Sequence, residues 1–278
     1  MQMGIMDQLV HSTTRIEAST SDGRGTCGTG FFMNFMEKND NAVPAIVTNK
    51  HVIKNSLVGS FNLTLKNSSG YPDIGNHKKY LFDNFENLWI PHPDENVDLA
   101  IFLIGPLLNE MANSSVELYY TPLSKSIIPS NQEREKLSPM EDIVMIGYPS
   151  GIWDSVNNLP VIRRGVSATH PSINWNGKME FLTDIASFPG SSGSPVLLVN
   201  LNGYSDRNGN SYLGASRVKL LGIHYAGTQH STSGEIKIIN IPTSLVPIPI
   251  TQIPNNIGVA INSSCLLDFD PILARNVR

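Results

Sequence analysis

The sequence predicts an all-β protein, built either as a β-sandwich or as a pair of β-barrels. More than ten short segments of strand length, apolar or alternating, recur at regular spacing along the 278 residues. Turn signals such as Asn-Gly separate these segments, and the chain has 22 glycines and 18 prolines. Helical periodicity is scarce. Together these observations favour many short strands over long helices.

The strands of the first half are predicted from apolar runs between turn residues. Gly28–Phe35 starts with small residues and continues with phenylalanines, which is typical of a buried strand. Asp98–Ile104 is a short apolar run of strand length. The expected strands are Thr14–Ala18, Gly28–Phe35, Ala42–Thr48, Leu57–Leu65, Leu81–Ile90 and Asp98–Ile104.

A less regular stretch to Met140 precedes the second half. The expected strands there are Ile143–Ile146, Val161–Thr169, Met179–Ile185, Pro195–Asn200, Val218–Tyr225 and Asn256–Ile261. Two segments look inserted, a polar hairpin at 201–216 and the proline-rich stretch Pro242–Pro254. The best helical signal is Asn262, a candidate N-cap before Ser263–Phe269.

Composition excludes several classes of protein. Hydrophobic residues make up 40% and charged residues 16%, which is enough for a full core and too apolar for disorder. The net charge of −4 argues against a nucleic-acid-binding groove. The sequence contains no run of 18 apolar residues, so it predicts no membrane-spanning helix. Its first residues lack a signal-peptide pattern. We therefore expect no nucleic-acid partner, no membrane association and a cytoplasmic location.

The two cysteines, Cys27 and Cys265, form neither a disulfide framework nor a zinc-binding spacing. A single bridge between them is left open. Two reduced thiols are the favoured interpretation, and they agree with a reducing compartment.

Three short segments carry residues suited to nucleophilic catalysis. Phe188–Val196 is a Gly/Ser turn that can expose a hydroxyl and aim backbone N–H groups at an oxyanion. His51 follows a predicted buried strand and could act as a general base. Asp98 precedes an apolar strand and could orient an imidazole. Taken singly, each also fits an ordinary loop, surface histidine or turn residue.

The order of these segments is more specific than any one of them. A His, an Asp and a Ser, each at a strand edge of an all-β chain, resemble the chymotrypsin-like (trypsin-fold) serine protease superfamily. The resemblance extends from about Gly28 to Phe269 and is closest to bacterial trypsin-like peptidases related to HtrA and to the glutamyl endopeptidases. The motifs that carry it are Gly28-Thr29-Gly30-Phe31, Thr48-Asn49-Lys50-His51-Val52, Val97-Asp98-Leu99-Ala100, Gly147-Tyr148-Pro149 and Pro189-Gly190-Ser191-Ser192-Gly193-Ser194-Pro195.

The resemblance implies a fold of two six-stranded antiparallel β-barrels with a short C-terminal helix. The whole chain, 1–278, would be one peptidase domain, with barrels at 14–115 and 140–262 and a helix and tail at 263–278. It implies a catalytic triad of His51, Asp98 and Ser192, with an oxyanion hole formed by the N–H groups of Gly190 and Ser192. Such chemistry requires neither a metal nor an organic cofactor, and its partner is a protein or peptide substrate.

The sequence departs from the trypsin pattern at two neighbours of Ser192. Ser191 stands where trypsins have the Asp that receives a newly cut N-terminus, so we expect no zymogen switch of that kind. Ser194 stands where glycine is usual, and a small side chain is expected to fit.

The specificity (S1) pocket is predicted from Ser187, His224, Ala226 and Gly227. Trypsins carry an Asp at the position of Ala186, so a preference for Arg or Lys is not expected, although a loop shift could bring Asp184 closer. The segment Leu221–Gly227 resembles the strand on which glutamyl endopeptidases and picornavirus proteases carry a His that binds Glu or Gln at P1. We therefore expect cleavage after Glu or Gln; a core histidine is the alternative for His224.

Two alternatives to an active endopeptidase follow from the same motifs. One is a peptide-binding module in which the triad is idle. The other is a latent enzyme that needs an activating partner protein, an option left open because the activation carboxylate is missing.

Overall fold

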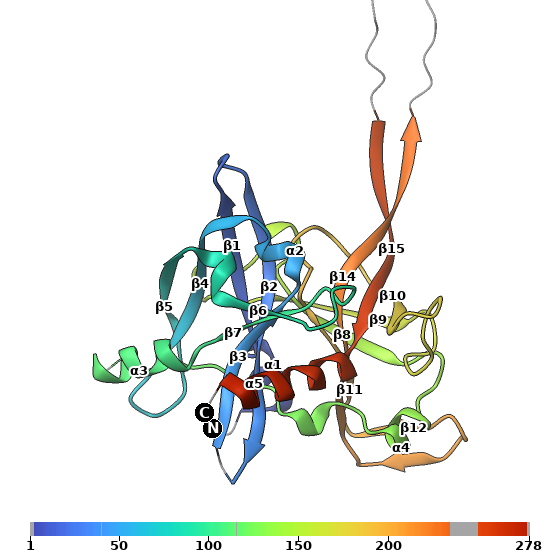
Figure 1. Ribbon diagram of the computed structural model, residues 1–278. Coiled ribbons are helices and arrows are strands. Elements are labelled where there is room, and N and C mark those ends of the chain that lie inside the picture. The colour runs from blue at the N-terminus through green and yellow to red at the C-terminus, as the bar shows by residue number, and fades with distance from the viewer. Residues whose placement is uncertain (1–2, 40, 115, 234–249, 277–278) are drawn as a thin grey trace, which may run out of the picture.

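Two β-rich halves make up the computed structural model, which describes residues 3–39, 41–114, 116–233 and 250–276 (Figure 1). In the first half the strands form one seven-stranded sheet in the order β5-β4-β1-β2-β3-β7-β6. These strands are β1 (Thr13–Thr20), β2 (Gly25–Lys38), β3 (Asn41–Thr48), β4 (Ser56–Lys66), β5 (Pro72–Asp83), β6 (Trp89–Pro91) and β7 (Ala100–Leu103).

The second half contains a closed barrel in the order β10-β15-β14-β11-β8-β9. Its six strands are β8 (Asp142–Gly147), β9 (Val161–Ser167), β10 (Glu180–Asp184), β11 (Pro195–Asn200), β14 (Arg217–Ser233) and β15 (Ile250–Asn262). The expected barrel of the second half is therefore confirmed. The predicted 201–216 insertion is a separate hairpin of β12 (Gly203–Ser205) and β13 (Ser211–Leu213).

The first half differs from the six-stranded barrel that the resemblance implied. Among the described residues its strands form an open sheet, with β5 and β6 at the two edges. The single strand expected at Leu81–Ile90 is divided: β5 ends at Asp83, a 3₁₀ turn η1 spans Phe85–Leu88, and β6 follows. Because β6 has only three residues and most of β5 is solvent-exposed, neither offers a long buried edge to close the sheet.

Two barrel strands are longer than the apolar segments from which they were predicted, Val218–Tyr225 and Asn256–Ile261. β14 and β15 continue past the barrel as a two-stranded ribbon, paired as far as Ser233 and Ile250 (Figure 1). Of the predicted stretch Pro242–Pro254, residues 242–249 lie outside the described part of the chain.

Helices are short and peripheral. They are α1 (Ile5–Val10), α2 (Lys50–Ile53), α3 (Gly105–Asn113), α4 (Asn131–Arg134) and α5 (Asp270–Asn276), with 3₁₀ turns η2 (Lys125–Ile127), η3 (Pro149–Gly151) and η4 (Ser263–Phe269). The predicted N-cap is confirmed, since the Asn262 side chain accepts a hydrogen bond from the N–H of Ser264 at 3.0 Å. α5 extends this C-terminal helical segment.

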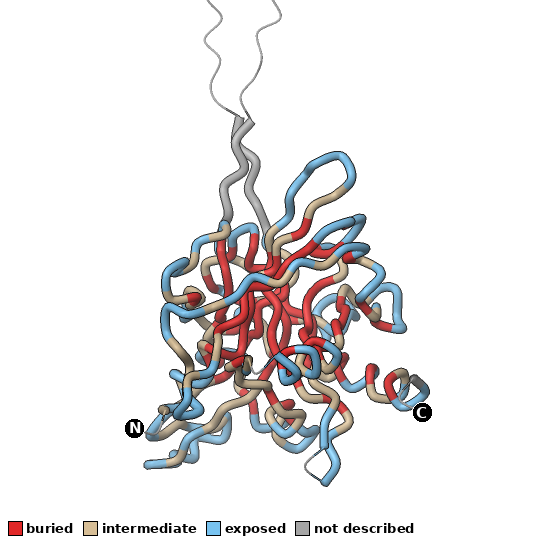
Figure 2. The backbone as a smooth tube through the Cα atoms, turned by 90° about the vertical axis from the view of Figure 1, so that its left-hand side faces the viewer, coloured by how far each residue is buried: buried red, intermediate tan, exposed pale blue. Residues whose placement is uncertain are grey.

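One hydrophobic core joins the two halves. It contains Phe31 and Leu99 from the sheet, Ile223 from the barrel and Phe269 from the C-terminal segment, all buried. Buried backbone is concentrated in the middle of the molecule, whereas the exposed backbone lies in loops and outer strands (Figure 2). This shared core holds the two halves against each other, so that loops from both meet at their boundary.

Candidate active site

His51 lies on a one-turn helix that follows a buried strand. β3 ends at Thr48, and α2 begins two residues later. Val52 of this turn packs against Gly28 of β2, where a Cβ would overlap the Val52 side chain. Because Gly28 has no side chain, Val52 of α2 can pack directly against β2. Val52 is buried, while the His51 side chain remains 46% exposed.

Asp98 binds His51 through two separate atoms. Its Oδ2 lies 2.5 Å from His51 Nδ1, and its Oδ1 accepts the backbone N–H of His51 at 3.0 Å. The buried side chain of Asn49 donates to the backbone carbonyl of Asp98 at 2.8 Å. The carboxylate thereby fixes the orientation of the ring and leaves Nε2 directed away from it.

Thr29 connects the loop of Ser192 to the sheet that carries His51. Its N–H donates to the Ser192 carbonyl at 2.9 Å, and its hydroxyl donates to the Gly190 carbonyl at 2.9 Å. The Thr29 carbonyl accepts the hydroxyl of Thr48 at 2.7 Å, three residues before His51. A short chain of hydrogen bonds thus runs from the end of β3 to the 188–194 loop of the second half.

Gly190 is held in a conformation that leaves backbone donors free. Its φ is +86°, and a Cβ there would overlap the carbonyl oxygen of Tyr148. The Pro189 carbonyl accepts the N–H of Ser150 at 2.5 Å. Because the C=O and N–H of a trans peptide point in opposite directions, the Gly190 N–H faces away from Ser150. Within the described residues, neither this N–H nor that of Ser192 donates a hydrogen bond, so both are available to an incoming oxygen.

The Ser192 hydroxyl is not bonded to His51 in this structure. It donates to the carbonyl of Tyr225 at 3.4 Å, and no hydrogen bond to His51 Nε2 is formed within the described parts of the chain. Such contacts are commonly long or absent in ligand-free enzymes and form when substrate binds. Of the three predicted triad residues, His51 and Asp98 are therefore directly paired, whereas the half-buried Ser192 makes no hydrogen bond to either among the described residues.

The predicted S1 residues meet on the barrel side of this loop. Ser187 Oγ and His224 Nε2 are 2.7 Å apart, and both residues are buried. Gly227 lies beside them, since a Cβ there would come 2.9 Å from Ser187 Oγ. Ala226 is half-buried between His224 and Gly227 on β14. Asp184, the alternative S1 residue, is exposed at the end of β10.

The nucleophile loop and the S1 strand are hydrogen-bonded to each other. Gly193 donates to the His224 carbonyl at 2.8 Å, and the His224 N–H donates to the Ser194 carbonyl at 2.9 Å. Burial, followed by the charges of Arg163 and His51, lowers the pKa of His224 to about 3. The imidazole is therefore neutral at physiological pH.

Comparison with known protein families assigns this chain to one of them. The sequence profile of the trypsin-like peptidase domain family matches residues 28–202, which is more than half of the chain. The chain belongs to the trypsin-like peptidase family. No curated protein gives a significant sequence match.

Solved protease structures share the fold of this peptidase domain at low sequence identity. An HtrA-type protease, AlgW with a tripeptide, aligns over 97% of this chain with a TM-score of 0.50 and 14% identity. This chain spans 62% of the length of that structure. Two other proteases also align: Deg5 (TM-score 0.44, 18% identity, 80% of this chain and 82% of that one) and the inactive form of the protease Rv3671c (TM-score 0.39, 15% identity, 92% and 86%).

Both departures from the trypsin pattern are accommodated. The buried Ser191 Oγ accepts a hydrogen bond from Arg163 Nη1 at 2.8 Å. Ser194 is also buried, and its hydroxyl donates to Thr29 Oγ1 at 3.2 Å. Ser194 fits because Gly147 has no side chain, as a Cβ at Gly147 would overlap the Ser194 hydroxyl.

Sequence reasoning missed two residues of this site. Thr29 lies in the Gly28–Phe31 motif, but its bonds to residues more than 160 positions away have no sequence signal. Arg163, in contrast, did have a sequence signal. Adjacent strand residues point to opposite faces, so of the pair Arg163-Arg164 one side chain must face the barrel interior.

A cavity of about 380 Å³ lies between the two halves next to Asp98. Asp94, Asn96 and Val97 line it from the first half, and residues 177–180 and Ile261 line it from the second. The Tyr225 hydroxyl donates to Glu180 Oε1 at 2.9 Å, beside this cavity. Burial, this hydrogen bond and the nearby carboxylates of Glu180 and Asp98 raise the pKa of Tyr225. The hydroxyl therefore remains protonated as a donor.

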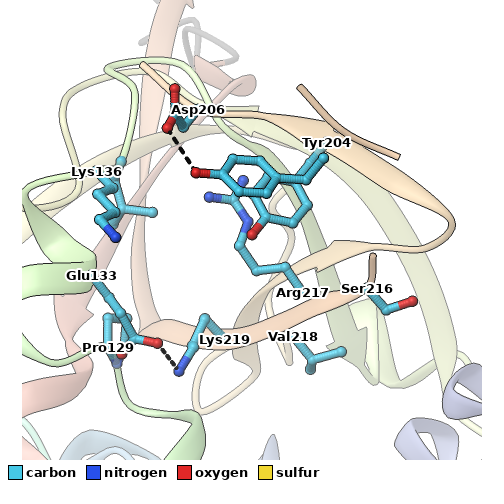
Figure 3. Close-up of a pocket in the computed structure, with 11 residues that line it drawn as sticks. Pro129, Glu133, Lys136, Tyr204, Asp206, Ser216, Arg217, Val218 and Lys219 are labelled. Carbon is cyan, nitrogen blue, oxygen red and sulfur yellow. Dashed lines mark hydrogen bonds and ion pairs between the residues drawn. The ribbon is translucent and has the colours of Figure 1, made fainter. Parts of the chain in front are cut away.

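A second cavity, of about 390 Å³, lies between the 201–216 hairpin and α4 (Figure 3). Several of its side chains contact one another: Tyr204 stacks on Tyr212, and Arg217 lies 4.3 Å above the centre of the Tyr204 ring. Lys219 pairs with Glu133 at 2.6 Å (Figure 3). None of the predicted site residues lines this cavity.

Cys27 and Cys265 are both free thiols. Among the described residues, no helix combines the length and apolar character that a membrane crossing requires.

Proposed function

We propose that this peptidase-family chain is a serine endopeptidase that hydrolyses peptide bonds with His51, Asp98 and Ser192. The observation that carries the proposal is the pair of hydrogen bonds that the Asp98 carboxylate accepts, one from the ring and one from the backbone N–H of His51. A carboxylate in this position fixes the Nδ1–H tautomer and stabilises the imidazolium that forms during proton transfer.

In the proposed acylation step, Ser192 Oγ attacks the scissile carbonyl carbon while its proton moves to His51 Nε2. The carbonyl oxygen becomes an oxyanion bound by the free N–H groups of Gly190 and Ser192. His51 then protonates the leaving amine, and an acyl-Ser192 ester remains. In deacylation, a water molecule loses a proton to His51, attacks the ester and releases the acid product, and the proton returns to Ser192.

Glu or Gln is the proposed P1 residue. Ser187 and His224 supply a hydroxyl and an imidazole at adjacent buried positions, and Gly227 leaves space beside them. An apolar P1 side chain would leave these groups without new partners, and sites of this kind reject such substrates strongly. The edge of β14 at Ala226–Gly227 is proposed to pair with the extended substrate backbone.

Cleavage of a diverse peptide library by the purified chain, read by mass spectrometry, tests both parts of the proposal. Ser192→Ala is the loss-of-function variant, and Ser211→Ala, on the exposed hairpin, is its matched control. Cuts after Glu or Gln that vanish only in Ser192→Ala are expected. Cuts after other residues would contradict the S1 assignment alone, and cuts that persist in Ser192→Ala would contradict the nucleophile.

A latent enzyme is the second candidate, favoured by the hydrogen bond from the Ser192 hydroxyl to Tyr225 rather than to His51. In that case an activating partner would redirect the hydroxyl. Labelling with a fluorophosphonate probe separates the two candidates, because an active enzyme is labelled as the isolated chain. The latent enzyme would be labelled only after a partner is added, and an idle binding module under neither condition.

A further inference from the structure

Arg163 is a half-buried, positively charged residue of β9 that contacts the loop of the predicted S1 residue Ser187. Its Nη1 donates to the Ala186 carbonyl at 2.7 Å and to Ser191 Oγ at 2.8 Å. Its Nε and Nη2 are also buried, and neither has a hydrogen-bond partner among the described residues. Burial lowers the pKa of Arg163 to about 10, which still leaves the guanidinium charged at neutral pH.

A second arginine of this chain shows the usual arrangement. Arg217 is 13% exposed and donates from Nη2 to Glu141 Oε2 at 2.8 Å, a carboxylate that is itself 7% exposed. No carboxylate within the described residues pairs with Arg163 in this way. Removing one partner from a buried ion pair leaves an uncompensated charge at a high free-energy cost, so a buried cation without its anion requires an explanation.

The two residues that Arg163 contacts lie in the same loop as the predicted S1 residue Ser187. Ala186 and Ser191, which it contacts, flank Ser187 in the same loop. Ser187 in turn contacts His224 at 2.7 Å. Burial lowers the pKa of His224, and the positive charge of Arg163 lowers it further. The imidazole is thus neutral, and it cannot itself supply the positive charge that a P1 carboxylate would meet.

We propose that Arg163 is a specificity-determining residue of the S1 site, whose uncompensated charge selects a P1 glutamate over the isosteric glutamine. This inference rests on the proposed function. Ser187 and His224 can hydrogen-bond either side chain, so they do not distinguish the two. A buried charge in a medium of low dielectric acts strongly on the carboxylate and only weakly on the neutral amide.

Two peptides that differ only in Glu or Gln at P1 provide the test. We expect the ratio of kcat/KM values (Glu over Gln) to fall at least tenfold in Arg163→Met, which corresponds to about 1.4 kcal/mol. Arg164→Met is the matched control, because Arg164 is the next residue of β9, is 75% exposed and pairs with Asp142 at 3.3 Å. Its ratio should equal that of the parent.

An arginine that merely supported the loop would affect both peptides equally. Equal losses for Glu and Gln in Arg163→Met, with the ratio unchanged, would therefore overturn the proposal. Ser191→Asp is a second variant that keeps the arginine and places a carboxylate beside it. If the charge selects glutamate, this variant lowers the ratio as well, so the test does not depend on the folding of Arg163→Met.

The pH dependence of the ratio separates Arg163 from His224 as the source of charge. If Arg163 supplies the charge, the ratio of kcat/KM values (Glu over Gln) stays constant from about pH 6 to pH 9. A ratio that falls as the pH rises through 6–7 would assign the charge to an imidazolium instead. Titration of Ser192→Ala with the same peptides gives the ratio of Kd values without turnover. If Ser192→Ala binds the glutamate peptide selectively and Arg163→Met/Ser192→Ala does not, the role of Arg163 is supported. Absence of cleavage by the parent protein would contradict only the proposed function, and the binding result would still test Arg163.

Discussion

The N–H of Thr29 donates to the carbonyl of Ser192 at 2.9 Å, across the boundary between the seven-stranded sheet and the barrel. The Thr29 hydroxyl adds three further contacts: it donates to Gly190 O and accepts from Tyr148 N and Ser194 Oγ. One strand residue of the first half thereby sets the position of the loop that carries the proposed nucleophile and oxyanion donors.

Thr29→Val keeps the shape of this residue and removes its hydroxyl. We expect the free energy of unfolding to fall by about 1–3 kcal/mol, because buried polar partners lose their hydrogen bonds. We also expect kcat/KM to fall for every substrate, since the whole loop loses its support. Chemical denaturation and peptide cleavage measure the two effects. Thr29→Ser retains the hydroxyl and should recover most of both; a Thr29→Val protein with parental stability would contradict this role.

Asp98→Asn removes the charge that faces His51 while the side chain keeps its size. If the triad is as proposed, kcat/KM should fall by roughly 10⁴, because the amide favours the wrong imidazole tautomer. Steady-state kinetics on any cleaved peptide provides the measurement. Asp142→Asn, which removes an exposed carboxylate from the start of β8, serves as the control. Comparable activity in the two variants would rule out the proposed role of Asp98.

Gly190→Ala tests the backbone of the oxyanion hole. The new Cβ meets the carbonyl of Tyr148, and we expect the peptide to rotate and kcat to fall by roughly 10²–10³, the usual effect of losing one donor. Gly177→Ala separates this clash from backbone strain, because Gly177 has a similar φ of +79° and a Cβ there would meet no atom within 4 Å. Kinetics and a thermal melt of both variants give the comparison. Parental kcat in Gly190→Ala would exclude the proposed donor.

The buried His224 makes stability depend on pH. Its pKa is lowered to about 3 in the folded protein and returns to about 6.5 on unfolding, so below pH 6.5 the unfolded chain binds the additional proton. His224 therefore contributes stability above pH 6.5, and this contribution is lost as pH falls towards 3. The loss is about 1.4 kcal/mol per pH unit, or roughly 2 kcal/mol between pH 6.5 and pH 5.

Urea unfolding of the parent and of His224→Gln at several pH values isolates this contribution from that of the carboxylates. The difference between the two proteins should shrink from pH 7 to pH 5. A constant difference would show that His224 titrates normally in the folded state.

Strands could be predicted where a run of apolar residues in their own sequence is buried in the core. β11 was predicted at its observed bounds, because Pro195–Asn200 is apolar between two turns. β5 was predicted only at its last residues, Leu81–Asp83, because residues 72–79 are largely exposed at a sheet edge and contain no apolar run. α3 was also missed, although Leu107 and Met111 are buried four residues apart on it, as expected for a helix.

The candidate triad could be proposed from the sequence because its residues lie in local motifs. His51, Asp98 and Ser192 each follow or precede an apolar strand, and their order along the chain made the assignment specific. Arg163 differs, because its surroundings come from Ala186 and Ser191, more than 20 residues away. The Arg163-Arg164 pair on a strand indicates that one arginine faces inward, but only the packing of strands and loops in three dimensions decides which residues it contacts.

The division of this site between two halves has a practical consequence. His51 and Asp98 belong to the sheet, whereas Gly190, Ser192 and His224 belong to the barrel and its loops. A chain opened between Asn113 and Asn131 would yield two fragments, each holding an incomplete set of the proposed catalytic residues. Hydrolysis would then report only the reassembled pair, which makes this connection a natural position for a split-protein sensor.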